Sequence, residues 1–498
     1  MTDFSYSEVF RLAVPESMLV VGALLVLLND LTVIRGRTSA QRSAFHATLT
    51  SATCLAGMAW LQIMPQAGAV ADGMIVMNPT IALVKQAILL LTAFTALISW
   101  RVEFTRHLGE YFALLLLATV GMLFLASARH LLMLFVALEL TSLALYILVA
   151  FHKESRASAE AALKYFLFGG MAAAFTLFGL SLVYGLAGSL SFSGIAEGVV
   201  GREPDMLFQV ALVMALVGLG FKVAVAPFHL WAPDVYQGAP TPAAALIASG
   251  SKVAGFFVLV SLLLGGFGTL AGDAGWGRFM PGWQPVLAIF AALSMVIGNL
   301  VALNQTRVKR LLAYSAIAHG GYALVGVMAN SAEGVSAVVY YAVTYALATL
   351  GAFAVVQVVE GDAGDDRLES FAGLRERSPV LALCLMVFML SAAGIPPLAG
   401  FFGKFYVFTA AVKTGSADLG LIWLVAIGVL MSAVSFYYYL QVLKRAFVAS
   451  APDGFSPLRV QPAVLAVILL IALGVVWFGC QPSVLLGPLS DGSPPLSP

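Results

Sequence analysis

Five lysines lie inside long apolar stretches of this sequence, where a charged side chain is costly. Lys222 lies in GLGFKVAVA, Lys252 in ALIASGSKVAGF and Lys404 in GIPPLAGFFGKFYVF. A lysine at the centre of a bilayer costs about 2.5–3.5 kcal/mol on insertion scales, so such residues usually mark an ion or proton pathway. Arginine stays protonated in proteins, whereas a desolvated lysine can release its proton. Because all five buried cations are lysine, the pattern favours proton transfer over a fixed structural charge.

One carboxylate has a comparable position in the sequence. Glu139 is central in the apolar run LMLFVALELTSLALYILVAF. At 1.5 Å per residue, Glu139, Lys222 and Lys252 each lie roughly 15 Å from a helix end, near the bilayer midplane. A carboxylate held close to a lysine would keep it protonated, and one moved away would release the proton. The alternatives are a structural ion pair for Glu139 and Lys222, and lysines that cap freed helix carbonyls for Lys252 and Lys404.

The remaining polar candidates carry weaker signals. Lys164, in EAALKYFLFGG, lies about one turn inside its span, where it is a possible relay or a side chain that reaches the membrane surface. Lys85 is interpreted as a surface-reaching anchor. His229 and His319 are suited to relaying protons, although a histidine hydrogen-bonded between helices is the commoner case. The run Tyr437–Tyr439 is interpreted as packing or interface aromatics.

The composition is that of an integral membrane protein. The 498 residues are 61% hydrophobic and 10% charged, with a mean hydropathy of +0.96, whereas soluble domains carry about 25% charged residues. The net charge of +1 predicts no nucleic-acid partner. The three cysteines are scattered and form no metal-binding spacing, so no metal site, iron–sulfur cluster or disulfide framework is predicted.

We predict an all-α integral membrane protein with about fourteen transmembrane helices. Runs of about 20 apolar residues recur along the whole length, as helices that cross a roughly 30 Å hydrocarbon core require. The expected spans are approximately 15–34, 43–64, 78–100, 111–127, 129–151, 159–187, 206–231, 242–268, 284–303, 307–328, 334–360, 379–412, 418–443 and 462–482. The polar gaps between them are too short for a soluble domain.

Two of these spans are interrupted by proline. Pro227 breaks span seven, and the pair Pro396-Pro397 breaks span twelve. Because the broken spans are five apart, a five-helix repeat at spans 4–8 that recurs at spans 9–13 would be inverted. Broken helices at corresponding positions of two inverted halves point to an ion path near the midplane. The predicted segments are a three-helix N-terminal part (1–110), a first repeat (111–268), a second, inverted repeat (284–445), and a C-terminal helix with its tail (446–498).

The distribution of the 26 lysines and arginines predicts the orientation. Short cytoplasmic loops are enriched in these residues. With the N-terminus outside, sixteen of them fall in inside loops and only five in outside segments. Both termini are therefore predicted to lie on the outer side.

Several segments together resemble a known family. HLWAPDVYQGAPTP, SGSKVAGF, LELTSLALYILVAF, EAALKYFLFG and GIPPLAGFFGKFYVF are similar to subunit N of bacterial NADH:quinone oxidoreductase, respiratory complex I. The resemblance extends from about Leu114 to Arg445. It implies an antiporter-like, multi-pass subunit of the bacterial inner membrane, with both termini on the periplasmic side.

The resemblance also implies a mechanism and a set of partners. In that family, protons are translocated while quinone is reduced in other subunits. The corresponding roles here are an input pair (Glu139 and Lys222), a central relay (Lys252) and a terminal lysine (Lys404). FMN, iron–sulfur clusters and quinone are expected in other subunits, so this chain would carry no cofactor, no redox centre and no NADH site. Its expected partners are the other membrane-arm subunits and the lipid bilayer.

Some features separate this sequence from related subunits. The length argues against the similar subunit L, which extends into a long lateral helix, and lysine at 404 argues against subunit M, where glutamate is usual. Ser251 stands where the family often has proline before the span-eight lysine. Two alternatives stay open: a subunit of a multisubunit sodium/proton antiporter, which shares the pattern of Glu139, Lys222 and Lys404, and a purely structural membrane subunit.

Overall fold

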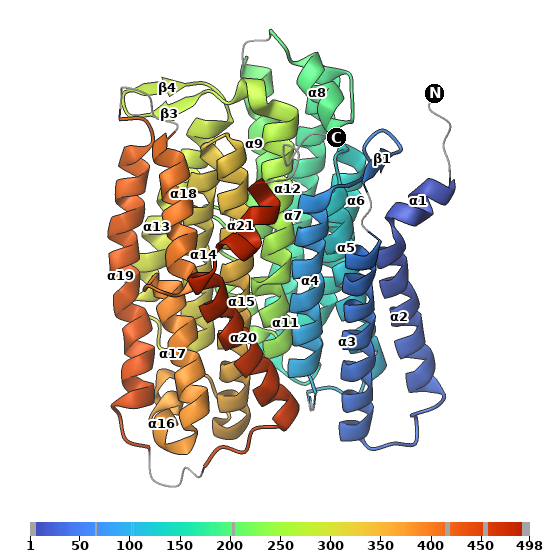
Figure 1. The fold of residues 1–498 in the computed structure, drawn as a ribbon, viewed down its shortest axis with the longest axis vertical. Helices are drawn as coiled ribbons and strands as arrows, with labels where there is room; N and C mark the ends of the chain where they lie inside the picture. The colour runs from blue at the N-terminus through green and yellow to red at the C-terminus, as the bar shows by residue number, and fades with distance from the viewer. Residues whose placement is uncertain are drawn as a thin grey trace.

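Long helices that run along one common axis make up this structure (Figure 1). The computed structural model describes residues 6–64, 67–100, 102, 104–201, 205–413, 419–451 and 457–490. The N-terminal elements are α1 (Tyr6–Leu12), α2 (Val14–Leu31), α3 (Ser39–Ile63), β1 (Gly68–Val70), β2 (Ile75–Met77) and α4 (Pro79–Ile98). The next are α5 (Leu108–Ser127), α6 (Leu131–Val149), α7 (Arg156–Ala187), α8 (Phe192–Gly198), α9 (Met206–Val223), α10 (Ala232–Gly238), α11 (Thr241–Ala248), α12 (Gly250–Phe267) and η1 (Gly268–Leu270).

The second half of the chain continues the same bundle. Two short antiparallel hairpins, β1–β2 and β3–β4, lie at the upper end in Figure 1 and are the only sheets among the described residues. The remaining elements are β3 (Asp273–Gly275), β4 (Arg278–Met280), α13 (Trp283–Ala302), α14 (Val308–Met328), α15 (Ala332–Ala363), η2 (Leu368–Phe371), α16 (Leu374–Arg377), α17 (Pro379–Ala393), α18 (Ala399–Lys413), α19 (Ile422–Phe447), α20 (Pro462–Cys480) and α21 (Ser483–Ser490).

Twelve helices in the described part of the chain are long and apolar enough to cross a membrane. Inside a bilayer a helix is favoured because it satisfies its own backbone hydrogen bonds. Two predicted spans are not among the twelve. The first is α3, a helix of 25 residues, and the second is the pair α17–α18, which takes the place of one long span. The class of all-α membrane protein is confirmed, while the count of fourteen stays a prediction.

Both predicted helix breaks are present. α9 ends at Val223, because Ala224 takes a left-handed conformation (φ 57°) and Pro227 cannot continue a helix. In the second half, α17 ends before Gly394 (φ 90°), and α18 starts two residues after Pro397. Each break leaves backbone N–H and C=O groups without helical hydrogen-bond partners. These free groups lie close in the sequence to the predicted membrane lysines Lys222 and Lys404.

The third helix of each repeat has the same length and the same end signals. α7 and α15 are both 32 residues long. Ser155 and Ser331 cap their N-termini, each accepting a hydrogen bond from the amide three residues on. Gly188 and Gly364 end them with φ of 71° and 78°, a conformation that glycine adopts without steric cost. The two halves therefore share local structure even where their residues differ.

Backbone bridges show that the halves are inverted. His130, before α6, forms an antiparallel bridge with Ser191, and Arg307, before α14, forms the same bridge with Arg367. Each bridge is held by two backbone hydrogen bonds of 2.8–2.9 Å. The first bridge immediately precedes α8 and the second precedes α16, and these helices lie at opposite ends of the bundle (Figure 1). This confirms the inverted repeat, whereas the exact segment boundaries stay predictions.

A third break lies in span eight, which the sequence predicted to be continuous over 242–268. Ser249 has φ −116° and ψ −85° and separates α11 from α12. Its hydroxyl donates to the carbonyl of Ala245, and serine bonds of this kind compete with helix continuation. Lys252 therefore lies directly after a break, in the first turn of α12.

Candidate functional site: a line of buried lysines between the two repeats

Lys222 and Glu139 lie close together without forming a direct ion pair. Lys222 is 2% exposed in the last turn of α9, and its Nζ donates to Ser142 Oγ at 3.3 Å. Ser142 lies one turn from Glu139 on α6, and the two charged groups interact electrostatically. Oε1 of Glu139 is buried and has no hydrogen-bond partner. The hydroxyl that binds the lysine, which itself donates to the carbonyl of Leu138, thus lies on the helix of the acid and one turn from it.

A glycine brings the helix of Lys252 against Lys222. A Cβ at Gly255 would lie 2.9 Å from Val223 Cγ1 and 3.4 Å from Lys222 Cγ. Gly255 is one turn after Lys252 on α12, so a larger residue there would push the two lysine-bearing helices apart. The close approach fixes the first two lysines of the line relative to each other.

Lys252 contacts the second repeat directly. It is 3% exposed, and its Nζ donates to the carbonyl of Ala316 on α14 at 2.6 Å. His319 follows Ala316 by one turn and interacts electrostatically with both Lys252 and Lys404. The imidazole thus couples the central lysine to the terminal one electrostatically.

His319 has a hydrogen-bond partner on each ring nitrogen. Its Nδ1 lies 2.7 Å from Tyr341 Oη and its Nε2 lies 3.1 Å from Tyr439 Oη. The hydroxyl of Tyr439 also bonds to Ser315. Tyr439 is buried against Tyr438, which agrees with the prediction of a packing aromatic, and its hydroxyl in addition binds the histidine. Helical spacing alone could not reveal this, because the histidine lies 120 residues away.

Lys404 lies at the second broken helix. It is 6% exposed, and its Nζ donates to the carbonyls of Ala392 (3.0 Å) and Ala393 (3.1 Å) and to Ser432 Oγ (2.8 Å). It also lies 5.0 Å from the centre of the Tyr322 ring. These carbonyls belong to the C-terminus of α17, where the helix dipole favours a cation. The helix break therefore explains how a lysine is held at this depth.

Lys164 lies outside this line. Its side chain is 38% exposed and forms ion pairs with Glu160 (2.6 Å) and Asp234 (2.7 Å). Asp234 also binds Arg310 at 2.5 Å. Partial burial alone raises the pKa of Asp234, but hydrogen bonds from Lys164 and Arg310 hold it below its usual value. The structure thus places Lys164 in a charge network at one end of the bundle, and its part in a relay stays a prediction.

His229 is buried in the segment between α9 and α10. Its Nδ1 has no hydrogen-bond partner. Nothing in the described part of the chain hydrogen-bonds it to Lys222 or Lys252, so its role also stays a prediction. No group of three His, Cys, Asp or Glu side chains that could hold a metal occurs in that same part of the chain.

Lys85 is not a surface anchor. It is fully buried on α4, and its Nζ binds Glu16 Oε1 at 2.6 Å, with the Glu16 side chain 1% exposed. The earlier interpretation is therefore wrong. The partner lies 69 residues away in the first turn of α2, and only the packing of the N-terminal helices brings it to Lys85.

Comparison with known proteins explains this architecture. Residues 128–435 match the NADH:quinone oxidoreductase/Mrp antiporter transmembrane family. The chain is 48% identical to NADH-quinone oxidoreductase subunit N 2 of Acidobacterium capsulatum, over 98% of this chain and 99% of that protein. The chain belongs to the subunit N family of NADH-quinone oxidoreductases.

Solved structures related to this subunit N family member share its fold. A chain of respiratory complex I from Thermus thermophilus is 35% identical and superposes with a TM-score of 0.79, covering 96% of this chain and 100% of that one. A chain of the Mrp complex from Dietzia sp. DQ12-45-1b has a TM-score of 0.79 at 19% identity, covering 96% of each chain. The second likeness concerns the fold alone.

Proposed function

We propose that this chain is the proton-translocating membrane subunit of an NADH:quinone oxidoreductase. The observation that carries the proposal is the line of buried side chains from Lys222 through Lys252 and His319 to Lys404, which starts beside the half-buried Glu139 and crosses from one repeat to the other. Membership of the subunit N family and the likeness to a complex I chain support the assignment to this complex.

On this proposal the chain moves protons and carries no redox centre. Quinone, FMN and iron–sulfur clusters belong to other subunits, and NADH is bound elsewhere in the complex. The partners are the other membrane-arm subunits and the lipid bilayer of the bacterial inner membrane, with both termini on the periplasmic side. On this orientation, the end of the bundle that carries α8 and the two hairpins faces the periplasm (Figure 1).

Proton transfer along this line depends on the electrostatic interaction between its charged side chains, because the protein interior screens charges much less than water does. Two unit charges about 10 Å apart interact by roughly 1.7 kcal/mol at an effective dielectric constant of about 20. A proton that arrives at Lys222 therefore changes the free energy of a proton on Lys252, and His319 extends this coupling to Lys404. Quinone reduction in other subunits would start the sequence by changing the charge or hydration near Glu139.

Replacing Lys222 by methionine tests the function. We expect an assembled complex with Lys222→Met to pump protons and to reduce quinone several-fold more slowly than the wild type, because the relay loses its first cation. The measurement uses inverted membrane vesicles, with assembly checked on the same membranes. Pumping at the wild-type rate and ratio would mean that the lysine is structural. Sodium-stimulated exchange without an electron donor would instead support the antiporter alternative.

Tyr439 offers a second, smaller prediction. Tyr439→Phe removes the hydroxyl that bonds Ser315 and His319 Nε2, so we expect the proton-pumping rate to fall by a few-fold with little loss of assembly. Tyr437→Phe is the matched control, since its side chain on the same helix is exposed and points away from His319 and Ser315. Equal rates for the two variants would exclude a special role for Tyr439.

A further inference from the structure

A large polar cavity opens between the two repeats at the end of the bundle that carries α16. Its volume is about 1020 Å³. Its wall comes from the start of α7, the turn before α11, the start of α14, the end of α15 and the segment before α20. The exposed residues Pro457 and Arg459 line its outer part, so the cavity reaches the surface. The distribution of positive charge predicts that this end faces the cytoplasm.

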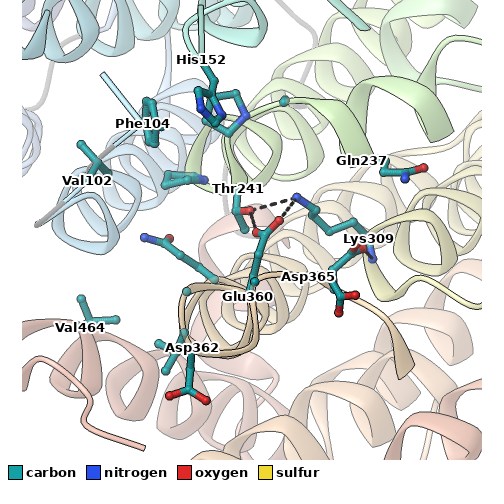
Figure 2. A pocket seen from close by; sticks show the side chains of 18 of the residues that line it. Val102, Phe104, His152, Gln237, Thr241, Lys309, Glu360, Asp362, Asp365 and Val464 are labelled. Atoms are coloured by element: carbon teal, nitrogen blue, oxygen red, sulfur yellow. Dashed lines mark hydrogen bonds and ion pairs between the residues drawn. The ribbon is translucent and has the colours of Figure 1, made fainter. Parts of the chain in front are cut away.

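Three side chains close the deep end of this cavity. Lys309 Nζ binds Glu360 Oε1 at 2.6 Å and Thr241 Oγ1 at 3.3 Å. The hydroxyl of Thr241 donates to Glu360 Oε2. Figure 2 shows these interactions as a closed triangle of dashed lines. Lys309 and Thr241 are buried, while the Glu360 side chain is 30% exposed and faces the cavity.

Two helices connect the cluster with the central lysine. Thr241 begins α11, and Lys252 follows eleven residues later, just after the break at Ser249. Lys309 and Ala316, which accepts the bond from Lys252, are seven residues apart and share one face of α14. The cluster is therefore connected to Lys252 in two ways: through α11, which precedes Lys252 in the chain, and through α14, whose Ala316 carbonyl accepts a hydrogen bond from the Lys252 ammonium group.

An unsatisfied acceptor in the wall indicates water. Gln357 lines the cavity one turn before Glu360, and its Nε2 donates to the carbonyl of Ile98 at 3.0 Å. Its Oε1 is buried without a hydrogen-bond partner. Buried acceptors are almost always satisfied, and in a polar cavity of this size water is the natural donor.

We propose that the Thr241–Lys309–Glu360 cluster is a gate that controls whether water passes from this cavity toward Lys252. The inference rests on the proposed function, which it extends by naming the side chains that control proton entry. In the closed state the cluster fills the neck. When the ion pair of Lys309 and Glu360 opens, water can pass along α11 toward the helix break at Ser249, where small residues surround the backbone.

Thiol labelling tests the gate without relying on pumping. Cys54 and Cys384 are buried and Cys480 is exposed, so the whole complex is prepared with Cys480→Ser. Ala157→Cys reports on the cavity in front of the gate, and Ala245→Cys reports on the buried turn behind it. The probe is a charged, membrane-impermeant methanethiosulfonate added to inverted vesicles. If Ala245→Cys impairs assembly, Ala244→Cys on the same helical turn replaces it.

We expect Ala157→Cys to react readily and Ala245→Cys to react slowly. Adding Glu360→Gln should accelerate labelling behind the gate by about tenfold, because a charge-assisted hydrogen bond is worth at least that factor. An unreactive Ala157→Cys would exclude a hydrated cavity. Equal labelling of Ala245→Cys with and without Glu360→Gln would exclude the gate.

A charge-conserving variant separates the gate from a structural ion pair. Lys309→Arg keeps the pair with Glu360, but the planar guanidinium binds a carboxylate through two hydrogen bonds and holds the gate closed. We expect pumping to fall several-fold, whereas Lys413→Arg in the exposed pair with Glu333 should leave it unchanged. Wild-type pumping by Lys309→Arg would overturn the gate. Failure of the proposed function would appear separately, as unaltered pumping by Lys222→Met.

Discussion

NADH-driven proton pumping should fall by about a hundredfold when Lys252 is replaced by arginine, which is the lower end of what a positioned proton-transfer group contributes. Arginine keeps the positive charge and can still donate to the carbonyl of Ala316, but it cannot release its proton. The effect should exceed that of Lys222→Met, because Glu139 remains as a titratable group beside position 222. Lys252 is the point at which the first repeat contacts the second.

The measurement is the rate of pumping and of quinone reduction in inverted vesicles, normalised to assembled complex. Lys252→Met removes both the charge and the exchangeable proton, whereas Lys252→Arg keeps the charge and removes only the exchange. We expect both variants to pump more slowly than the wild type. Arginine is larger than lysine, so Lys413→Arg at an exposed ion pair controls for the substitution itself. A Lys252→Arg complex that pumps at the wild-type rate would show that position 252 needs only a fixed charge.

The buried pair of Glu16 and Lys85 should give the largest effect on stability. Removing one partner of a buried ion pair leaves an uncompensated charge and typically costs about 3–5 kcal/mol. Both side chains are almost completely buried and joined at 2.6 Å. We therefore expect Glu16→Gln or Lys85→Met alone to reduce strongly the amount of assembled subunit and its thermal stability.

The double variant distinguishes the ion pair from simple packing. With both charges removed, Glu16→Gln/Lys85→Met should recover most of the stability, because replacing a buried pair by neutral groups is often close to neutral. The measurement is a double-mutant cycle on the thermal midpoint of the purified complex. Additive losses in the double variant would contradict the prediction. Glu333→Gln with Lys413→Met, a pair exposed to solvent, should change the midpoint little.

The sequence by itself determined the class of the protein, most of its helices and the burial of Lys222, Lys252 and Lys404. These features depend on local properties. Hydropathy over about 20 residues defines a span, and Pro227 and Pro396-Pro397 break a helix wherever they occur in one. The positions of Lys222, Lys252 and Lys404 followed directly, because the cost of burying a charge can be read from its apolar neighbours. The break at Ser249 was missed, since a serine beside a glycine is a much weaker signal than proline.

Only the tertiary structure decided which side chains meet. Glu16 pairs with Lys85 across 69 residues, and Tyr439 reaches His319 across 120. Lys164 lies at a charged end of the bundle, where Asp234, 70 residues away in the sequence, binds it. Periodicity gives the face of a helix on which a residue lies but not the helix that packs against that face. The packing of the helices decides which side chains contact each other. For this reason the sequence could not predict that Thr241, Lys309 and Glu360 form a cluster.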